Sequence, residues 1–152
     1  MKKMLWCAAM AIVLSGMATG CAKSDEDMQP VVNEKGLRES VQGKWRIERV
    51  NNKLCRSGNC TSVMYTGTTS DYFEFKADSA FLQRASQQND KSVYRDSFKA
   101  DYSQPNAFVL SNFGWSARFH VLHHDQRMLV LEGTYYGSDP SAIFTDTYYL
   151  YR

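Results

Sequence analysis

Short segments that alternate apolar and polar residues recur along the chain from residue 44 onward, and turn residues separate them. Such alternation over about four to eight residues is typical of a β-strand with one buried face. Only residues 37–42 favour a helix, of one or two turns, and no longer stretch shows the apolar stripe of a long helix. The predicted strands are residues 44–51, 71–77, 80–85, 92–100, 107–110, 115–122, 128–135 and 144–152.

The short connections between these segments predict that consecutive strands pair as antiparallel hairpins, as in residues 71–77 and 80–85. An open sheet of this size would leave two strand edges exposed, whereas closure into a barrel leaves none. The 9 Tyr, 8 Phe and 3 Trp also favour strands. We therefore predict an all-β domain, an eight-stranded antiparallel up-and-down barrel, in preference to a Greek-key sandwich.

The N-terminus has the pattern of a cleaved bacterial signal peptide, residues 1–20. Lys2 and Lys3 precede an apolar run at residues 4–14, and small residues follow it up to Cys21. At about 1.5 Å per residue, this run is too short to span the ~30 Å hydrocarbon core of a bilayer. Removal of the leader takes away two of the 18 basic residues, so 16 basic residues remain against 16 acidic residues. A chain with no net side-chain charge is not expected to bind nucleic acid.

Residues 18–21, Ala-Thr-Gly-Cys, resemble the lipoprotein box of bacterial envelope proteins, which implies that Cys21 carries acyl chains such as palmitate and becomes the new N-terminus. The alternative is an ordinary signal peptidase that cuts the same bond. Acyl chains on one cysteine would anchor the protein to a membrane. The acidic tract at residues 25–27 resembles the export signal of surface-displayed lipoproteins. We expect the outer membrane of a Gram-negative bacterium and its outer face, with the periplasmic face as the alternative.

Residues 21–36 form the predicted lipidated N-terminus and linker, and residues 37–152 form the predicted barrel domain. At the start of the first strand, Gly43-Lys44-Trp45 resembles the Gly-x-Trp opening of lipocalin-like barrels. The stretches at residues 72–78 and 128–132 are similar to segments of small lipocalin-like lipoproteins of the bacterial envelope. The resemblance implies that Trp45 closes one end of the barrel under a late arginine, for which Arg152 is the best match, and that the barrel binds a small, commonly apolar, ligand. Residues 145–148, Thr-Asp-Thr-Tyr, are similar to a second lipocalin motif but lie in the last predicted strand, so we assign them no role.

Two cysteines of the barrel domain, Cys55 and Cys60, lie five positions apart between the first two predicted strands. In an exported protein this spacing predicts a disulfide that pins a hairpin tip or loop. The alternatives are a redox pair or half of a metal site, but the spacing is not Cys-x-x-Cys and no second pair completes a zinc site. A further hypothesis is that the loop closed by this disulfide shapes the entrance of the barrel.

The histidines, His120, His123 and His124, lie within five residues. Strand alternation would point His120 and His124 the same way, as a metal site requires, but an exposed hairpin tip is the simpler interpretation. The chain has no Gly-x-Ser-x-Gly, phosphate-binding loop or His-Glu-x-x-His motif. The prediction is a protein that is not an enzyme, with no cofactor and no metal site.

Aromatic residues on the predicted inner face are the candidate ligand site, since ligand pockets are mostly apolar. In the strand at residues 80–85, this interpretation puts Phe81 inside and Leu82 and Arg84 outside. The alternative is a filled barrel that acts as an interaction module or as an accessory subunit of a surface protein complex, with residues 135–136 and 149–151 as its contact surface. The candidate residues are Trp45, Phe73, Phe75, Phe81, Phe98, Trp115, Phe119 and Tyr148.

Overall fold

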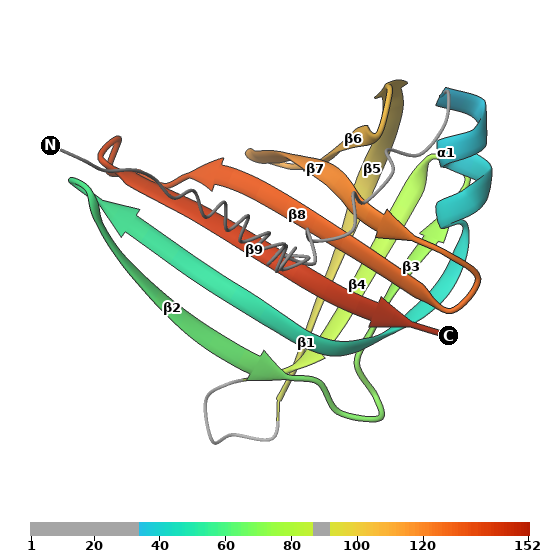
Figure 1. The fold of residues 1–152 in the computed structure, drawn as a ribbon, viewed down its shortest axis with the longest axis horizontal. Coiled ribbons are helices and arrows are strands. Elements are labelled where there is room, and N and C mark those ends of the chain that lie inside the picture. The colour runs from blue at the N-terminus through green and yellow to red at the C-terminus, as the bar shows by residue number, and fades with distance from the viewer. Residues whose placement is uncertain (1–33, 87–91) are drawn as a thin grey trace, which may run out of the picture.

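The computed structural model describes residues 34–86 and 92–152, which form one short helix and nine β-strands (Figure 1). The only predicted helical segment, residues 37–42, lies almost wholly within the helix. The elements are α1 (Glu34–Val41), β1 (Gly43–Arg56), β2 (Asn59–Thr66), β3 (Tyr72–Lys76), β4 (Ser79–Ala85), β5 (Val93–Gln104), β6 (Ala107–Asn112), β7 (Trp115–His124), β8 (Met128–Tyr136) and β9 (Ala142–Tyr151).

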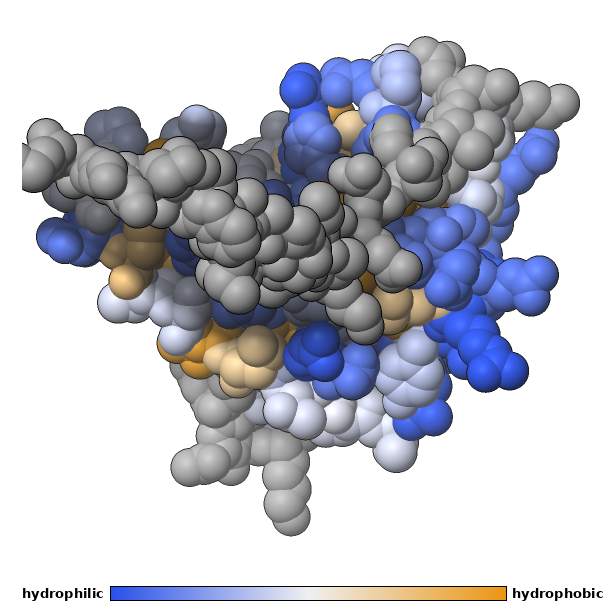
Figure 2. All heavy atoms as spheres, viewed as in Figure 1, coloured by the Kyte–Doolittle hydropathy of each residue, from blue (hydrophilic) through white to orange (hydrophobic). Residues whose placement is uncertain are grey.

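The sheet closes on itself because β1 pairs with the last strand, β9, over residues 46–56 and 142–151. From β3 to β9 each strand pairs antiparallel with the next, and β3 returns to β1. The eight strands β1 and β3 to β9 therefore form a closed antiparallel barrel, which confirms the predicted fold, including the β3–β4 hairpin. On the face shown in Figure 2, many of the described side chains are hydrophilic, with smaller apolar groups between them, as expected for strands whose outer residues alternate with buried ones.

The ninth strand, β2, was not expected, and the predicted end of the first strand at residues 51–52 is wrong. Two consecutive asparagines favour a turn, but Asn51 and Asn52 pair with β2 on one side and β9 on the other. The chain turns later, at Ser57 and Gly58, which both have positive φ, as a tight hairpin turn requires. This turn sets Cys55 opposite Cys60, and the predicted disulfide between them is confirmed.

Strands β2 and β3 share one side of β1, with β3 beside its first residues and β2 beside the rest. The other edge of β2 pairs with no described strand. Hydrogen bonds to the carboxylate of Asp71 connect the end of β2 to β4 instead. Asp71 is 1% exposed, and its Oδ2 accepts hydrogen bonds from the Tyr65 hydroxyl and the Thr68 backbone N–H, both at 2.6 Å. Its Oδ1 accepts the backbone N–H of Ala85 in β4 at 2.8 Å. One side chain thus ties β2 and β4 together.

Helix α1 and Trp45 close one end of the barrel. The Trp45 side chain is fully buried, and its Nε1 donates a hydrogen bond to the Val41 carbonyl at 2.8 Å. The Arg152 guanidinium lies 3.7 Å from the centre of the Trp45 ring and donates to the Gln42 carbonyl. Gly43 has a φ of 107°, and a Cβ there would lie 3.2 Å from the Arg152 guanidinium. This end is built as the lipocalin resemblance implies, and we call it the closed end.

The predicted signal peptide at residues 1–20, the lipidation site Cys21 and the linker up to residue 33 lie outside the described residues. Helix α1 begins at Glu34 and so includes the last residues of the linker predicted at 21–36. Within the described residues, no helix combines the length and the apolar character needed to cross a bilayer.

Candidate functional site

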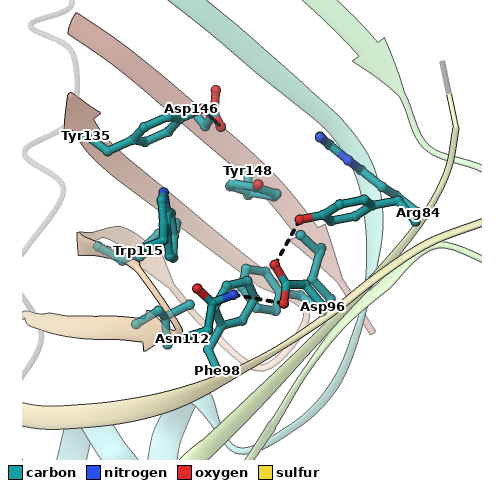
Figure 3. A pocket seen from close by; sticks show the side chains of 13 residues that line it. Arg84, Asp96, Phe98, Asn112, Trp115, Tyr135, Asp146 and Tyr148 are labelled. Carbon is teal, nitrogen blue, oxygen red and sulfur yellow. Dashed lines mark hydrogen bonds between the residues drawn. The ribbon is translucent and has the colours of Figure 1, made fainter. Parts of the chain in front are cut away.

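A cavity of about 310 Å³ lies inside the barrel, and Figure 3 shows the side chains that line it. The cavity lies toward the end where β1 turns into β2, because Asp146 pairs with Asn52 in the later part of β1, whereas α1 precedes the first residue of that strand. We call this end the open end. Ligand pockets commonly measure about 300–1,000 Å³, so the cavity has the size of a small-molecule site. Its walls come from β3 to β9, in the lining residues Phe73, Leu82, Arg84, Tyr94, Asp96, Phe98, Leu110, Asn112, Trp115, Phe119, Tyr135, Asp146 and Tyr148.

Polar and apolar lining residues separate along the barrel axis. Residues two apart on a strand face the same side, so a step of two toward the open end moves from one lining residue to the next. This step leads from Leu82 to Arg84 on β4, and from Leu110 to Asn112 on β6. We call Phe73, Leu82, Phe98, Leu110, Phe119 and Tyr148 the floor, and Arg84, Tyr94, Asp96, Asn112, Trp115, Tyr135 and Asp146 the rim.

The carboxylate of Asp96 on the rim is held by three donors. The Tyr94 hydroxyl donates to its Oδ2 at 2.8 Å, and the Asn112 side-chain amide donates to its Oδ1 at 2.9 Å (Figure 3). The backbone N–H of Ser97 donates to the same Oδ1. Burial and the contact with Asp96 raise the pKa of Tyr94, so its hydroxyl keeps the proton that it donates. The hydrogen-bonding capacity of Asp96 is therefore largely used within the protein.

Asp146 has a different environment on the opposite wall. Among the described residues, it accepts one hydrogen bond, from the Tyr135 hydroxyl at 3.2 Å. Burial raises the pKa of Asp146 above its ordinary value of 3.8, although the Tyr135 hydrogen bond and the positive charge of Arg84 act in the other direction. Burial also raises the pKa of Tyr135 to about 12, and Asp146 adds to that shift. The negative charge of Asp146 is therefore less favourable than that of an exposed aspartate.

Arg84 is the basic residue of the rim, and it lies across the cavity from Trp115 (Figure 3). Its guanidinium stands 5.4 Å from the ring centre of Tyr94 and 5.9 Å from that of Tyr65. The Nη1 atom is buried and has no hydrogen-bond partner among the described residues. Arg84 also forms no salt bridge within the described part of the chain. A charged donor therefore lies unused beside the cavity.

Five of the eight predicted site residues line the cavity together: Phe73, Phe98, Trp115, Phe119 and Tyr148. Their role as ligand contacts stays a prediction. Trp45 lies at the closed end, and Phe75 is core, with its ring 4.7 Å from that of Phe73. The prediction that Phe81 points into the barrel is wrong, because its side chain is 37% exposed on the outer face.

The error at β4 has a physical cause in the β3–β4 turn. Only Ala77 and Asp78 separate the two strands, so Phe75 pairs with Ala80 and Phe73 with Leu82. Residues directly opposite each other share a face, and so the inner face of β4 carries Ala80, Leu82 and Arg84. The hairpin register was the signal that would have placed Arg84 inside.

Three of the other missed rim residues, Asp96, Asn112 and Asp146, are not aromatic, so a search for aromatic residues passed over them. Asp146 belongs to the motif at residues 145–148, and Tyr135 was assigned to an outer contact surface, whereas both line the cavity. Of that predicted surface, Tyr149 and Tyr151 lie outside, beneath the guanidinium groups of Arg49 and Arg46.

The prediction that His120 and His124 face the same way is wrong because β7 contains a bulge. The register with β8 shifts between Val121 and His123, so the following residues change faces. His120 stays exposed, while His124 packs edge-on against Trp45 and contacts the Ser40 carbonyl at 3.0 Å. In the described residues no three His, Cys, Asp or Glu side chains gather as a metal site would require.

Comparison with known proteins adds little to this geometry. No protein-family model matches the chain, and no curated protein sequence matches it. Among solved structures it is similar to the bovine lipocalin allergen Bos d 2, with 15% sequence identity and a TM-score of 0.47. That match covers 76% of this chain and 74% of the allergen. The barrel is established here by its own strand pairings.

Proposed function

We propose that this protein is a non-enzymatic binding protein of the bacterial cell envelope that holds a small amphipathic ligand in its barrel. The observation that carries this proposal is the cavity of about 310 Å³ with an apolar floor and a polar rim. A ligand with one apolar end would bury it against the floor, and its polar end would meet donors and acceptors at the rim. A wholly apolar ligand would leave the buried Nη1 of Arg84 without solvent or an acceptor.

Binding is favoured over catalysis by the kinds of residue at the cavity. Its described lining has no serine, threonine, cysteine, lysine or histidine, the residues that most often act as nucleophiles or bases. Asp96 already accepts three hydrogen bonds within the protein. The lining is therefore chemically suited to hold a molecule rather than to transform one.

The envelope location in this proposal depends on the leader and on Cys21, which the lipoprotein-box resemblance singles out. Acyl chains on Cys21 would hold the barrel at the outer membrane, and the acidic residues 25–27 favour the outer face. Mass spectrometry of protein from its native membrane tests this part. We expect an N-terminal peptide that begins at Cys21 with added acyl mass. An unmodified Cys21 would contradict the anchor.

Uptake of a neutral fluorescent probe, N-phenyl-1-naphthylamine, tests the binding function. The full chain with Cys21→Ser, which cannot be acylated, allows the titration without detergent. We expect saturable binding of one probe per barrel. Leu110→Phe should weaken this binding, because the larger side chain reduces the cavity volume at the floor. The matched control Phe81→Ala removes an aromatic ring from the outer face and should leave probe binding unchanged. A barrel that takes up no probe would contradict the proposal and favour the interaction module.

A further inference from the structure

The ligand chemistry follows from the unpaired cation on the rim, provided that the barrel binds a ligand as proposed above. We propose that the ligand is an amphipathic carboxylate, whose carboxylate pairs with Arg84 while its apolar part lies on the floor. A guanidinium presents a planar fork of N–H donors that matches the two oxygens of a carboxylate.

Arg84 is placed to receive an anion. Its Nη1 is buried without a hydrogen-bond partner among the described residues, and a buried charged donor left unpaired is costly. The ring centres of Tyr65 and Tyr94 lie 5.9 and 5.4 Å from the guanidinium carbon, and these neutral rings offer the charge no anionic partner. A ligand carboxylate would supply the missing acceptor.

The two acidic residues of the rim do not favour a cationic ligand in its place. Asp96 is held by the Tyr94 hydroxyl, the Asn112 amide and the Ser97 backbone N–H. Asp146 is half-buried, and burial disfavours its charged form. Each carboxylate accepts at least one hydrogen bond, whereas Nη1 of Arg84 has no acceptor among the described residues. The hydrogen-bonding group that the rim lacks is therefore an acceptor for this guanidinium.

The cavity also limits the size of the ligand. A water molecule takes about 30 Å³ in the liquid, so a volume of about 310 Å³ holds roughly ten groups of that size. This corresponds to a medium-chain fatty acid or a one- or two-ring carboxylic acid rather than to a whole phospholipid. Because Arg84 lies nearer the open end than Leu82 on β4, the carboxylate would lie toward solvent and the apolar part would point inward.

Three probes with one tail separate the possibilities at pH 7 in the Cys21→Ser chain: decanoate, decanol and decyltrimethylammonium. We expect calorimetry to show that decanoate binds at least about tenfold more tightly than decanol, as a charge-assisted pair predicts. The cationic probe should bind more weakly than either. This comparison needs no change at Arg84.

Substitutions at Arg84 then assign the preference to one residue. Arg84→Met keeps an unbranched apolar chain and should remove the advantage of decanoate while decanol binding stays within about twofold. Arg84→Lys should restore part of it. The matched control is Arg95→Met, since Arg95 is an exposed arginine on the outer face of β5 that donates a hydrogen bond to Gln83, and decanoate binding should not change.

Each outcome has a separate meaning. Equal binding of decanoate and decanol, or tighter binding of the cationic probe, would overturn the carboxylate assignment and leave the binding function intact. A decanoate preference that survives Arg84→Met, with the variant folded by circular dichroism, would overturn the role of Arg84. No binding of any of the three probes, together with no uptake of N-phenyl-1-naphthylamine, would overturn the proposed function itself.

Discussion

Replacing Asp71 by asparagine keeps the shape of the side chain but removes one of its two acceptor oxygens. The carboxylate receives the Tyr65 hydroxyl and the Thr68 N–H on one oxygen and the Ala85 N–H on the other. An asparagine oxygen that keeps the first two donors turns its amide NH₂ toward the Ala85 N–H. Two donors then face each other in a place where the side chain is 1% exposed.

The size of the effect follows from these contacts. A hydrogen bond to a charged group contributes about 1.5–3 kcal/mol, so the loss at Ala85 costs about that much. The two remaining bonds lose their charge assistance, at roughly 1 kcal/mol each. We expect Asp71→Asn to reduce the free energy of unfolding by about 3–5 kcal/mol, a large part of the ~5–15 kcal/mol typical of a domain.

Urea denaturation, followed by circular dichroism, measures this change. With a slope of about 1–3 kcal/mol per molar urea, the midpoint should fall by at least about 1 M. Asp125→Asn is the matched control. Its Oδ1 accepts the backbone N–H groups of Arg127 and Met128, both at 2.7 Å, and asparagine keeps both bonds. Within the described residues, the substitution alters only the contact of Oδ2 with His123, an exposed pair that adds little to stability, so the midpoint should move far less. Equal midpoints for Asp71→Asn and the unchanged protein would refute the reasoning.

The pH dependence gives a second check on Asp71. Burial alone would raise its pKa, but the hydrogen bonds from Tyr65, Thr68 and Ala85 outweigh burial and hold the pKa below its ordinary value of 3.8. A carboxyl group whose pKa is lower in the folded state stabilises the protein above its unfolded pKa, and this contribution is lost as the pH falls through the folded pKa. The stability difference between the unchanged protein and Asp71→Asn should therefore shrink below about pH 4.

Three further substitutions test other parts of the barrel. Gly133→Ala would place a Cβ 2.6 Å from the Phe119 ring, so it should cost about 1–3 kcal/mol and weaken probe uptake as the ring moves toward the cavity, measured by urea titration and probe fluorescence. Arg152→Met removes the cation above Trp45 and should cost about 1 kcal/mol and shift the tryptophan emission to the red. Serine at both cysteines of the β1–β2 hairpin should cost about 2 kcal/mol in chain entropy and weaken ligand binding if the pinned hairpin shapes the entrance, whereas unchanged calorimetric affinity would limit the disulfide to a stabilising role.

The closed barrel was predictable because most strands bury one face. Burial of one face requires apolar and polar residues to alternate along the strand, and this alternation is visible in the sequence. Strand β2 has no such pattern, because Tyr65 is its only buried residue. Among the described strands it pairs along one edge only, and it extends beyond β3, so neither of its faces is covered over most of its length. Its Val63 and Met64 are more than half exposed. A strand without a buried face carries little periodic signal, which is why the chain after Asn51 was expected to leave the sheet.

The faces of individual strands were harder to predict than the strands themselves. One residue of register exchanges the inner and outer faces of a strand. On β4, the prediction took Phe81 as an inner residue and therefore put Arg84 on the outer face, whereas the pairing with β3 puts Arg84 on the inner face. On β7, the bulge puts His124 on the face of Val121 and not on the face of His120, where alternation would put it. Alternation within one strand does not determine its phase. The turn length and the bulge determine it, and both depend on the pairing with neighbouring strands.

The two ends of the barrel differ in what lies beside their buried polar groups. At the closed end, three carbonyls at the end of α1 have side-chain partners: Val41 accepts from Trp45, Gln42 accepts from Arg152, and the carbonyl of Ser40 contacts His124. On the same side of the barrel, the Tyr102 hydroxyl and the Asn106 side-chain oxygen are buried without a partner among the described residues. At the open end, Arg84 leaves a buried N–H group unpaired among the described residues. Stable folds satisfy buried polar groups, and departures from that rule are expected where a site acts on something outside the chain. Of the buried side-chain atoms without a partner among the described residues, only Arg84 Nη1 belongs to a residue that lines the internal cavity and carries a charge. This is the physical reason to place the ligand site at the open end rather than beside Trp45.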